Sequence, residues 1–469
     1  MIHLRRIALL PLLLVVVAGL SGCDTLSDFF TTRSTEKLPG TRISVLALER
    51  ELRPNVESVD TQIILPRPED TATWPGAGGL SHHAMHHLVI GDAPKRVWTV
   101  AAGEGSDLRN RAFAEPIVAG GRIYTMDSYG AVTAFEAANG KRVWRISTEP
   151  VTERGKAASF GGALCISDMG FCGSRRDNSF LGGALCIEGN RLFATTGAGE
   201  VLALDAATGK EIWRVSVGVP VRAAPTVNAG RVFVVNVENE LTALAADTGR
   251  KLWTYSGSPA PTILLGGAAP AVDGGVVVAT LSSGEMVALR TDNGVMLWNE
   301  NLVAVRRTEA AASLPDIAAR AVIDKGRVYA VGQSGVLAAI DLRTGRRVWD
   351  VPVAGIHEPW IAGDFIFAIT LDSEAVCIDA RSGRILWVTQ LPAYEDERAK
   401  RDRIVWAGPA LVSDRLILVS STSEALSVSP YSGAVLGKIE LRESSSLAPV
   451  FANGTMYLLD DDGDLSAYR

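Results

Sequence analysis

A strand–turn–strand unit recurs along this chain at intervals of roughly 40 to 50 residues. In residues 201–213, VLALDAATGKEIW, side chains of alternating character predict a strand with two faces. Residues 206–209 then provide turn chemistry, because Gly209 adopts a positive φ without steric cost. Trp213 ends the unit as a large apolar anchor. Each complete copy predicts four short strands, and repeats of this kind are typical of a β-propeller.

Eight copies can be aligned, and the incomplete ones indicate how the fold closes. Six copies end in tryptophan: Trp144, Trp213, Trp253, Trp298, Trp349 and Trp387. The seventh copy, residues 409–436, keeps its strands but has lost the tryptophan, and the eighth stops at the C-terminus before a fourth strand. Residues 94–98, PKRVW, form an unmatched fourth strand upstream, which would complete the last copy and cover its edge.

We therefore predict an all-β fold, an eight-bladed β-propeller of four-stranded blades over residues 89–469, closed by an N-terminal strand. The alternative is a β-solenoid, which needs no closure. The formal net charge of −6 argues against nucleic acid as a partner, since phosphate binding requires a basic surface.

The first residues are typical of a targeting segment. Arg5 and Arg6 precede an apolar stretch, residues 7–19, and the stretch ends at LSGC, which resembles the lipobox of bacterial lipoproteins. We predict a signal peptide over residues 1–22 and lipidation at Cys23. An ordinary secretory signal or a short membrane anchor are the alternatives. Asp24 raises the alternative of retention at the inner membrane, because enterobacterial lipoproteins use Asp there for that purpose.

Residues 23–88 carry no repeat and are predicted to form a lipidated tether and an extended wrapping segment. Residues 43–52 and 61–65 are apolar enough to lie against a folded surface, while prolines interrupt any long element.

The repeats have the form A-x-D-x-x-T-G-x-x-x-W and resemble the propellers related to quinoprotein dehydrogenases. With the lipobox and the lead-in segment, the chain is most similar to the BamB family, lipoproteins of the outer-membrane β-barrel assembly machinery. The resemblance implies a non-catalytic scaffold without cofactor, facing the periplasm at the cell outer membrane and held by the Cys23 lipid. Its implied partners are BamA and other subunits of the complex, and unfolded outer-membrane proteins held by β-augmentation.

Two other functions remain open. A periplasmic dehydrogenase dependent on pyrroloquinoline quinone would need Ca²⁺, an Asp base and an adjacent pair of cysteines, and no two cysteines adjoin here. The third candidate is a binding propeller of another envelope complex. We predict no catalytic, cofactor-binding or metal-binding residue.

Three further motifs have structural explanations. His82, His83, His86 and His87 have spacings that could place imidazoles on one helix face for zinc, but no Cys or acid lies nearby, and we interpret them as a solvated loop. Residues 460–464, DDDGD, lack the downstream Glu of a calcium loop and are predicted to form a hairpin turn. The insertion at residues 145–181 contains a near-duplicate of residues 179–187, for which we predict no function, and it could hold a Cys165–Cys172 disulfide.

The resemblance also implies where the partner binds. The family's docking loop of L-x-L-R-G type aligns with residues 262–266, where Leu264 and Gly266 match and Leu265 replaces the arginine. An acidic loop one blade on aligns near Asp316, with Ala318 where a second Asp is expected. We predict partner contacts at Ile263, Leu264, Leu265, Gly266 and Asp316, with a buried inter-blade turn as the alternative for residues 263–265.

Overall fold

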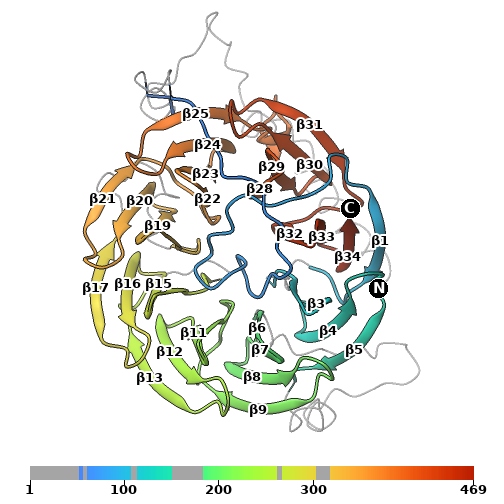
Figure 1. Cartoon of the computed structure of the whole chain (residues 1–469), viewed down its shortest axis with the longest axis vertical. Helices are drawn as coiled ribbons and strands as arrows, with labels where there is room; N and C mark the ends of the chain where they lie inside the picture. Colours follow the sequence, from blue (N-terminus) through green and yellow to red (C-terminus); the bar gives the residue numbers. More distant parts are fainter. Residues whose placement is uncertain (1–51, 56–60, 107–113, 150–182, 261–266, 303–316) are drawn as a thin grey trace, which may run out of the picture. The chain divides into compact units, whose positions relative to one another are not determined.

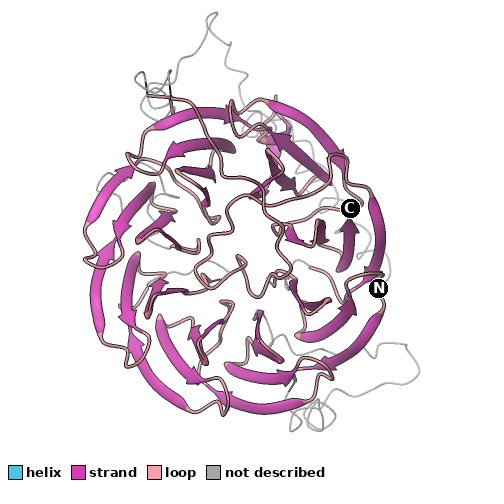
Figure 2. Cartoon of the chain, in the orientation of Figure 1, coloured by secondary structure: helices cyan, strands magenta, loops and turns pink. Residues whose placement is uncertain are grey.

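The computed structural model describes residues 52–55, 61–106, 114–149, 183–260, 267–302 and 317–469. All of them belong to the second of two compact units, Leu52–Arg469. Every regular element among them is a β-strand, and the strands form eight four-stranded antiparallel sheets arranged as the blades of a ring (Figures 1 and 2). The predicted eight-bladed propeller is confirmed.

The blades follow the chain in order, and within each blade the strands run from the centre of the ring outwards (Figure 1). Blades 1 to 4 contain β2 (Ile117–Ala119), β3 (Arg122–Met126), β4 (Ala131–Glu136) and β5 (Arg142–Ser147); β6 (Leu185–Glu188), β7 (Arg191–Thr195), β8 (Glu200–Asp205) and β9 (Glu211–Ser216); β10 (Thr226–Asn228), β11 (Arg231–Val235), β12 (Glu240–Ala245) and β13 (Lys251–Ser256); and β14 (Ala271–Asp273), β15 (Val276–Thr280), β16 (Glu285–Arg290) and β17 (Met296–Asn301).

Blades 5 to 8 contain β18 (Val322–Asp324), β19 (Arg327–Gly332), β20 (Val336–Asp341) and β21 (Arg347–Val351); β22 (Trp360–Ala362), β23 (Phe365–Ile369), β24 (Glu374–Asp379) and β25 (Ile385–Gln390); β28 (Trp406–Val412), β29 (Arg415–Ser420), β30 (Glu424–Val428) and β31 (Val435–Glu440); and β32 (Val450–Ala452), β33 (Thr455–Leu459), β34 (Asp464–Tyr468) and β1 (Arg96–Ala101). An additional hairpin, β26 (Tyr394–Asp396) and β27 (Arg401–Arg403), lies in the connection between blades 6 and 7.

The two ends of the propeller sequence meet in blade 8. Strand β1 pairs with β34 in antiparallel register, with Trp98 opposite Ala467. The Lys95 N–H donates to the Arg469 carbonyl at 2.8 Å, and the Arg469 N–H donates back to the Lys95 carbonyl at 3.0 Å. The predicted closure of the ring by the orphan N-terminal strand is confirmed.

Neighbouring blades are joined by a tryptophan that packs on a glycine. Trp213 of blade 2 donates its indole N–H to the Ala246 carbonyl in the next blade at 3.1 Å. Its ring covers Gly249, which has a φ of 71°, and a Cβ added there would lie 2.7 Å from the ring. Glycine is therefore required both by the backbone conformation and by the close approach of the indole. The same contact recurs in the pairs Trp98–Gly140, Trp144–Gly209, Trp253–Gly294, Trp298–Gly345, Trp349–Gly383 and Trp387–Gly433.

The junction between blades 7 and 8 lacks this contact for a structural reason. Gly437 opposes Ser427 in the register position that tryptophan holds in the other blades, as Trp213 opposes Ala203. Blade 8 offers no turn glycine to receive an indole, because its third and fourth strands come from the two ends of the propeller sequence. The tryptophan is thus absent where its docking site is absent.

The contact predicts a difference between two glycines of the same blade. We expect Gly249→Ala to lower the free energy of unfolding by about 2–5 kcal/mol, because it adds a clash with the indole to the backbone strain. Gly230→Ala is the matched control, since Gly230 has a φ of 72° but no atom within 4 Å of an added Cβ. Gly230→Ala should lower the free energy of unfolding by only about 1–2 kcal/mol. Equal losses in denaturant unfolding would contradict the role assigned to Trp213.

Candidate partner-binding site

The ring has two faces that differ in which turns they carry. On the first, which we call the tether face, the first strand of each blade turns into the second and, in blades 1 to 7, the third turns into the fourth. On the opposite loop face, the second strand turns into the third, and the connections between blades run. This division follows from the antiparallel order of the strands in every sheet.

The predicted partner contacts at Ile263, Leu264, Leu265, Gly266 and Asp316 lie outside the described residues. Their described flanks belong to connections between blades, on either side of blade 4, and therefore to the loop face. The prediction of two docking segments one blade apart stays a prediction. The structure describes the residues that flank these segments, which we call the frame.

Hydrogen bonds across a blade boundary hold the flank before residue 261. Ser258 donates its N–H and its hydroxyl to the Glu285 carboxylate at 2.8 and 2.9 Å, and the Ser283 hydroxyl adds a third bond at 3.0 Å. Partial burial acts to raise the pKa of Glu285, but these hydrogen bonds outweigh it and lower the pKa below its usual value. Glu285 therefore stays charged and fixes the connection from blade 3 to blade 4.

Apolar burial holds the flanks of the second segment. Leu302, at the end of β17, and Ile317, before β18, are 1% and 2% exposed and belong to one hydrophobic cluster with Trp298. The second candidate docking segment thus leaves the ring from buried ends, and hydrogen bonds hold the flank that precedes the first, an arrangement suited to presenting loops to a partner.

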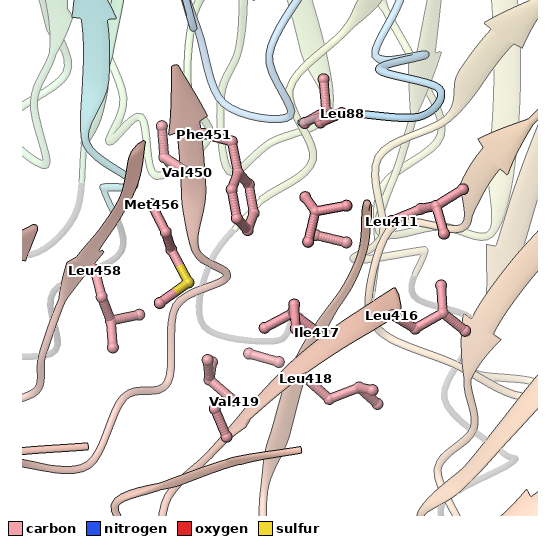
Figure 3. Close-up of a cluster of buried hydrophobic side chains, with 14 of the residues drawn as sticks. Leu88, Leu411, Leu416, Ile417, Leu418, Val419, Val450, Phe451, Met456 and Leu458 are labelled. Carbon is pink, nitrogen blue, oxygen red and sulfur yellow. The ribbon is translucent and has the colours of Figure 1, made fainter. Parts of the chain in front are cut away.

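The centre of the tether face is covered by residues 61–93, which follow an irregular path with turns across it (Figure 1, blue). Their backbone pairs with the inner strands of different blades, for example Trp74 with Val118 of blade 1 and Leu88 with Leu411 of blade 7. Leu88 also lies in a cluster with side chains of blades 7 and 8, among them Leu411 and Phe451 (Figure 3).

Hydrogen bonds join this central segment to all eight blades. In blade order they link Trp74 with Val118, Pro75 with Ile187, Ser81 with Asn228, Ser81 with Val272, His82 with Ile323, His86 with Trp360, Leu88 with Leu411, and Thr71 with Asn453. The segment is therefore part of the folded ring.

The interpretation of the four histidines as a solvated loop is wrong for His83 and His87, which are 3% and 1% exposed. Each is hydrogen-bonded to a backbone carbonyl, His83 Nδ1 to Ala321 at 2.8 Å and His87 Nδ1 to Pro66 at 2.7 Å. The loop is buried because it lies against the inner strands of blades 5 to 7, which the sequence before the first repeat did not reveal. No group of three metal-binding side chains occurs within the described ranges.

A cluster of charged side chains lies beneath the central segment and was missed from the sequence. Arg320 Nη2 lies 2.7 Å from Glu115 Oε1, and Arg320 Nε lies 2.5 Å from Glu358 Oε2. The Gly78 N–H of the central segment donates to Glu115 Oε2 at 3.0 Å. The cluster therefore ties blades 1, 5 and 6 to the N-terminal segment.

Glu115, Arg320 and Glu358 occupy the same position in their blades. Each lies two residues before the first residue of the inner strand that pairs with the second strand. The other five blades place small residues there, namely Ala184, Ala224, Ala269, Gly408 and Ala448. Alignment of the repeats on this position would have revealed the cluster, because charge there departs from the pattern of the fold.

Burial shifts the titration of the groups around Arg320. It raises the pKa of Glu358 to about 7, although Arg320 acts to lower it. Burial, helped by the positive charge of Arg320, lowers the pKa of His357 to about 4 and that of His83 to about 3. Both imidazoles are therefore neutral near pH 7, while Glu358 titrates there.

These shifts predict opposing pH effects on stability. Because the pKa of Glu358 is raised in the folded protein, the free energy of unfolding falls as pH rises from about 4.5 to about 7. The lowered pKa values of His83 and His357 make the free energy of unfolding fall as pH drops below about 6.5. We expect Glu358→Gln to match the wild type at pH 5 and to exceed it by about 2–3 kcal/mol at pH 7.5. Denaturant unfolding at the two pH values measures this, and a pH-independent difference would contradict it.

The remaining sequence predictions concern the acidic turn and the cysteines. Residues 460–463 form the turn between β33 and β34, where Asp460 Oδ1 accepts the Asp464 N–H at 2.8 Å, so the predicted hairpin turn is confirmed. Cys186 and Cys377 are buried free thiols, whose pKa burial raises. The proposed Cys165–Cys172 disulfide lies outside the described residues. None of the described segments forms an apolar helix of membrane-spanning length.

Comparison with solved structures supports the fold. The crystal structure of BamB from Moraxella catarrhalis matches with a TM-score of 0.64 and 16% identity, covering 80% of this chain and 100% of that chain. Quinohemoprotein alcohol dehydrogenase from Comamonas testosteroni matches with a TM-score of 0.61 and 13% identity, covering 85% and 81%. At these identities the likeness establishes the propeller fold alone.

Sequence comparison identifies the family. Outer membrane protein assembly factor BamB from Moranella endobia is 22% identical over 377 residues, 80% of this chain and 90% of the relative. The protein of that name from Escherichia coli K12 is 25% identical over 385 residues, 79% and 87%. The family model described as outer membrane protein assembly factor BamB matches residues 92–164 and 167–389. The chain therefore belongs to the BamB family of outer membrane protein assembly factors.

Proposed function

We propose that the chain is a non-catalytic scaffold subunit of the β-barrel assembly machinery, which supports insertion of outer-membrane proteins by binding BamA through its loop face. It is anchored by a lipid at Cys23 and faces the periplasm. The observation that carries the proposal is family membership, established over more than half of the chain. The relatives named as assembly factors in turn favour a role in outer membrane assembly without catalysis.

The frame around blade 4 supports the location of the docking site. The Ser258–Glu285 bonds and the buried Leu302 and Ile317 fix the ends of the two predicted docking segments on one face. A rigid frame lowers the entropy cost of ordering loops at an interface, so a partner gains affinity there.

The docking prediction is tested by a double substitution. We expect Leu264→Asp with Leu265→Asp to reduce recovery of BamA with the tagged protein from detergent-solubilised membranes, because charge disrupts an apolar contact. The apparent Tm should change little. A large fall in Tm would instead identify residues 263–265 as a buried turn.

Blade 4 supplies the matched control for this experiment. Val295 and Met296 are 54% and 50% exposed and lie on the tether face of the same blade. Changing both to Asp should leave recovery of BamA intact. If the wild-type protein recovers subunits of another envelope complex and no BamA, the proposal fails in favour of a binding propeller of that complex.

The rival function is a quinone-dependent dehydrogenase, since propellers of such enzymes share the fold. We expect that incubation of the purified protein with pyrroloquinoline quinone and Ca²⁺ produces neither cofactor absorbance nor dye-linked alcohol oxidation. If the protein instead shows stoichiometric absorbance of the bound cofactor together with alcohol oxidation, the scaffold function is wrong and an enzymatic function takes its place.

A further inference from the structure

The two faces of the ring carry opposite charge at periodic positions. On the loop face, six blades begin the third strand with an acidic residue: Glu200, Glu240, Glu285, Glu374, Glu424 and Asp464. On the tether face, five blades begin the second strand with arginine: Arg122, Arg191, Arg231, Arg327 and Arg415. Five blades also place a basic residue directly after the glycine of the turn into the fourth strand: Lys141, Lys210, Arg250, Arg346 and Arg384.

Carboxylates on the tether face are largely engaged within their own turns. Asp205 Oδ1 accepts the Thr208 hydroxyl and N–H, and Asp341 does the same with Thr344. These bonds lower the pKa of both carboxyls and hold them close to the turn backbone. Lys141, Lys210 and Arg250, by contrast, extend into solvent as exposed side chains.

Exposed apolar side chains concentrate on the same face. Ten of the large apolar residues exposed in the described ranges lie in the turn before the fourth strand or in the first two residues of that strand: Val97, Val143, Ile212, Val295, Met296, Leu297, Val348, Tyr431, Val435 and Leu436. Ile64 and Leu80 belong to the central segment, and only Ile356 and Val405 lie in connections of the loop face.

The chain also leaves the ring from this face. The Asn55 N–H donates to the Ile385 carbonyl at 2.9 Å, and Asn55 Oδ1 accepts the Ile385 N–H at 2.7 Å. Ile385 is the first residue of β25, directly after the turn on the tether face. The predicted anchor Cys23 precedes Leu52 by 29 residues. A chain of that length reaches at most about 100 Å when fully extended, so the predicted anchor keeps the ring within that distance of the bilayer.

We infer that the tether face lies against an anionic phospholipid surface, with the acidic loop face turned away from it. Basic residues are attracted to an anionic leaflet within a Debye length, and apolar side chains beside them enter the interfacial region. Three carboxylates of the loop face are paired with basic side chains of that face, Glu200 with Arg214, Glu424 with Lys438 and Asp464 with Arg442. Repulsion from the same surface therefore comes from other acidic residues of the loop face, such as Glu240 and Glu285. This orientation goes beyond the proposed assembly role: it leaves the loop face open to a protein partner, and it uses the lipid anchor only to bring the ring to the membrane.

Hydrogen–deuterium exchange of the full lipidated protein tests the orientation. The protein is reconstituted in nanodiscs of phosphatidylethanolamine alone or mixed with phosphatidylglycerol. We expect the anionic lipid to slow exchange several-fold in the tether-face turns around residues 137–142, 206–211 and 246–251. The loop-face turns around residues 196–200 and 236–240 should be unchanged, and high salt should abolish the effect. Slowing on the loop face, or the same slowing without anionic lipid, would overturn the inference.

Two charge-reversal variants complete the test. Lys141→Glu, Lys210→Glu and Arg250→Glu together should remove the lipid-dependent slowing. The control, Arg398→Glu, Lys400→Glu and Arg401→Glu, reverses three exposed basic residues of the β26–β27 hairpin on the loop face and should retain it. Both variants should keep the wild-type Tm.

Recovery of BamA, measured in parallel, separates this inference from the proposed function. The tether-face variant should still recover BamA. If the tether-face variant loses BamA while the wild-type protein shows the lipid-dependent slowing of exchange, only docking at the loop face is refuted. If the slowing of exchange persists in the tether-face variant, only the membrane orientation is refuted.

Discussion

The packing of a tryptophan on a glycine of the next blade is the interaction on which the ring depends. Each indole covers a backbone turn of the next blade, and six of the described indoles also donate a hydrogen bond to it, as Trp213 does at Gly249 and Ala246. One flat side chain thus fixes both the spacing and the angle between two sheets. Repeated around the ring, this contact makes each blade the support of its neighbour. It also accounts for the exception, Gly437, which faces the place where the chain ends meet.

The N-terminal segment adds a second, radial set of connections. It hydrogen-bonds to every blade, and it places the Gly78 N–H on the carboxylate of Glu115. The charges of Arg320, Glu115 and Glu358 compensate one another beneath it, where an unpaired charge would be costly. This arrangement occupies the tether face, whereas the antiparallel order of the strands places the inter-blade connections on the loop face. The separation of charge between the faces follows the same division.

Much of the fold was predictable because repetition makes turn and anchor residues visible. The A-x-D-x-x-T-G-x-x-x-W pattern predicted the four strands of each blade, and residues 94–98 predicted closure by β1. The path of residues 61–93 was not predictable, since a segment used once leaves no periodic signal. The burial of His83 and His87 follows from that path. The Glu115–Arg320–Glu358 cluster was missed for a different reason, because the charge at this repeat position stands out only when the blades are aligned on it.

The pairing of β1 with β34 also constrains the order in which the molecule can form. A polypeptide emerges with its N-terminus first, so β1 and the central segment are available long before blade 8 exists. Strand β1 cannot reach its final hydrogen bonds until Arg469 has been made. The central segment cannot complete its own hydrogen bonds until blade 8 exists, because one of them joins Thr71 to Asn453. Contacts of such long sequence separation form slowly. The topology therefore delays closure of the ring until β34 has been synthesised.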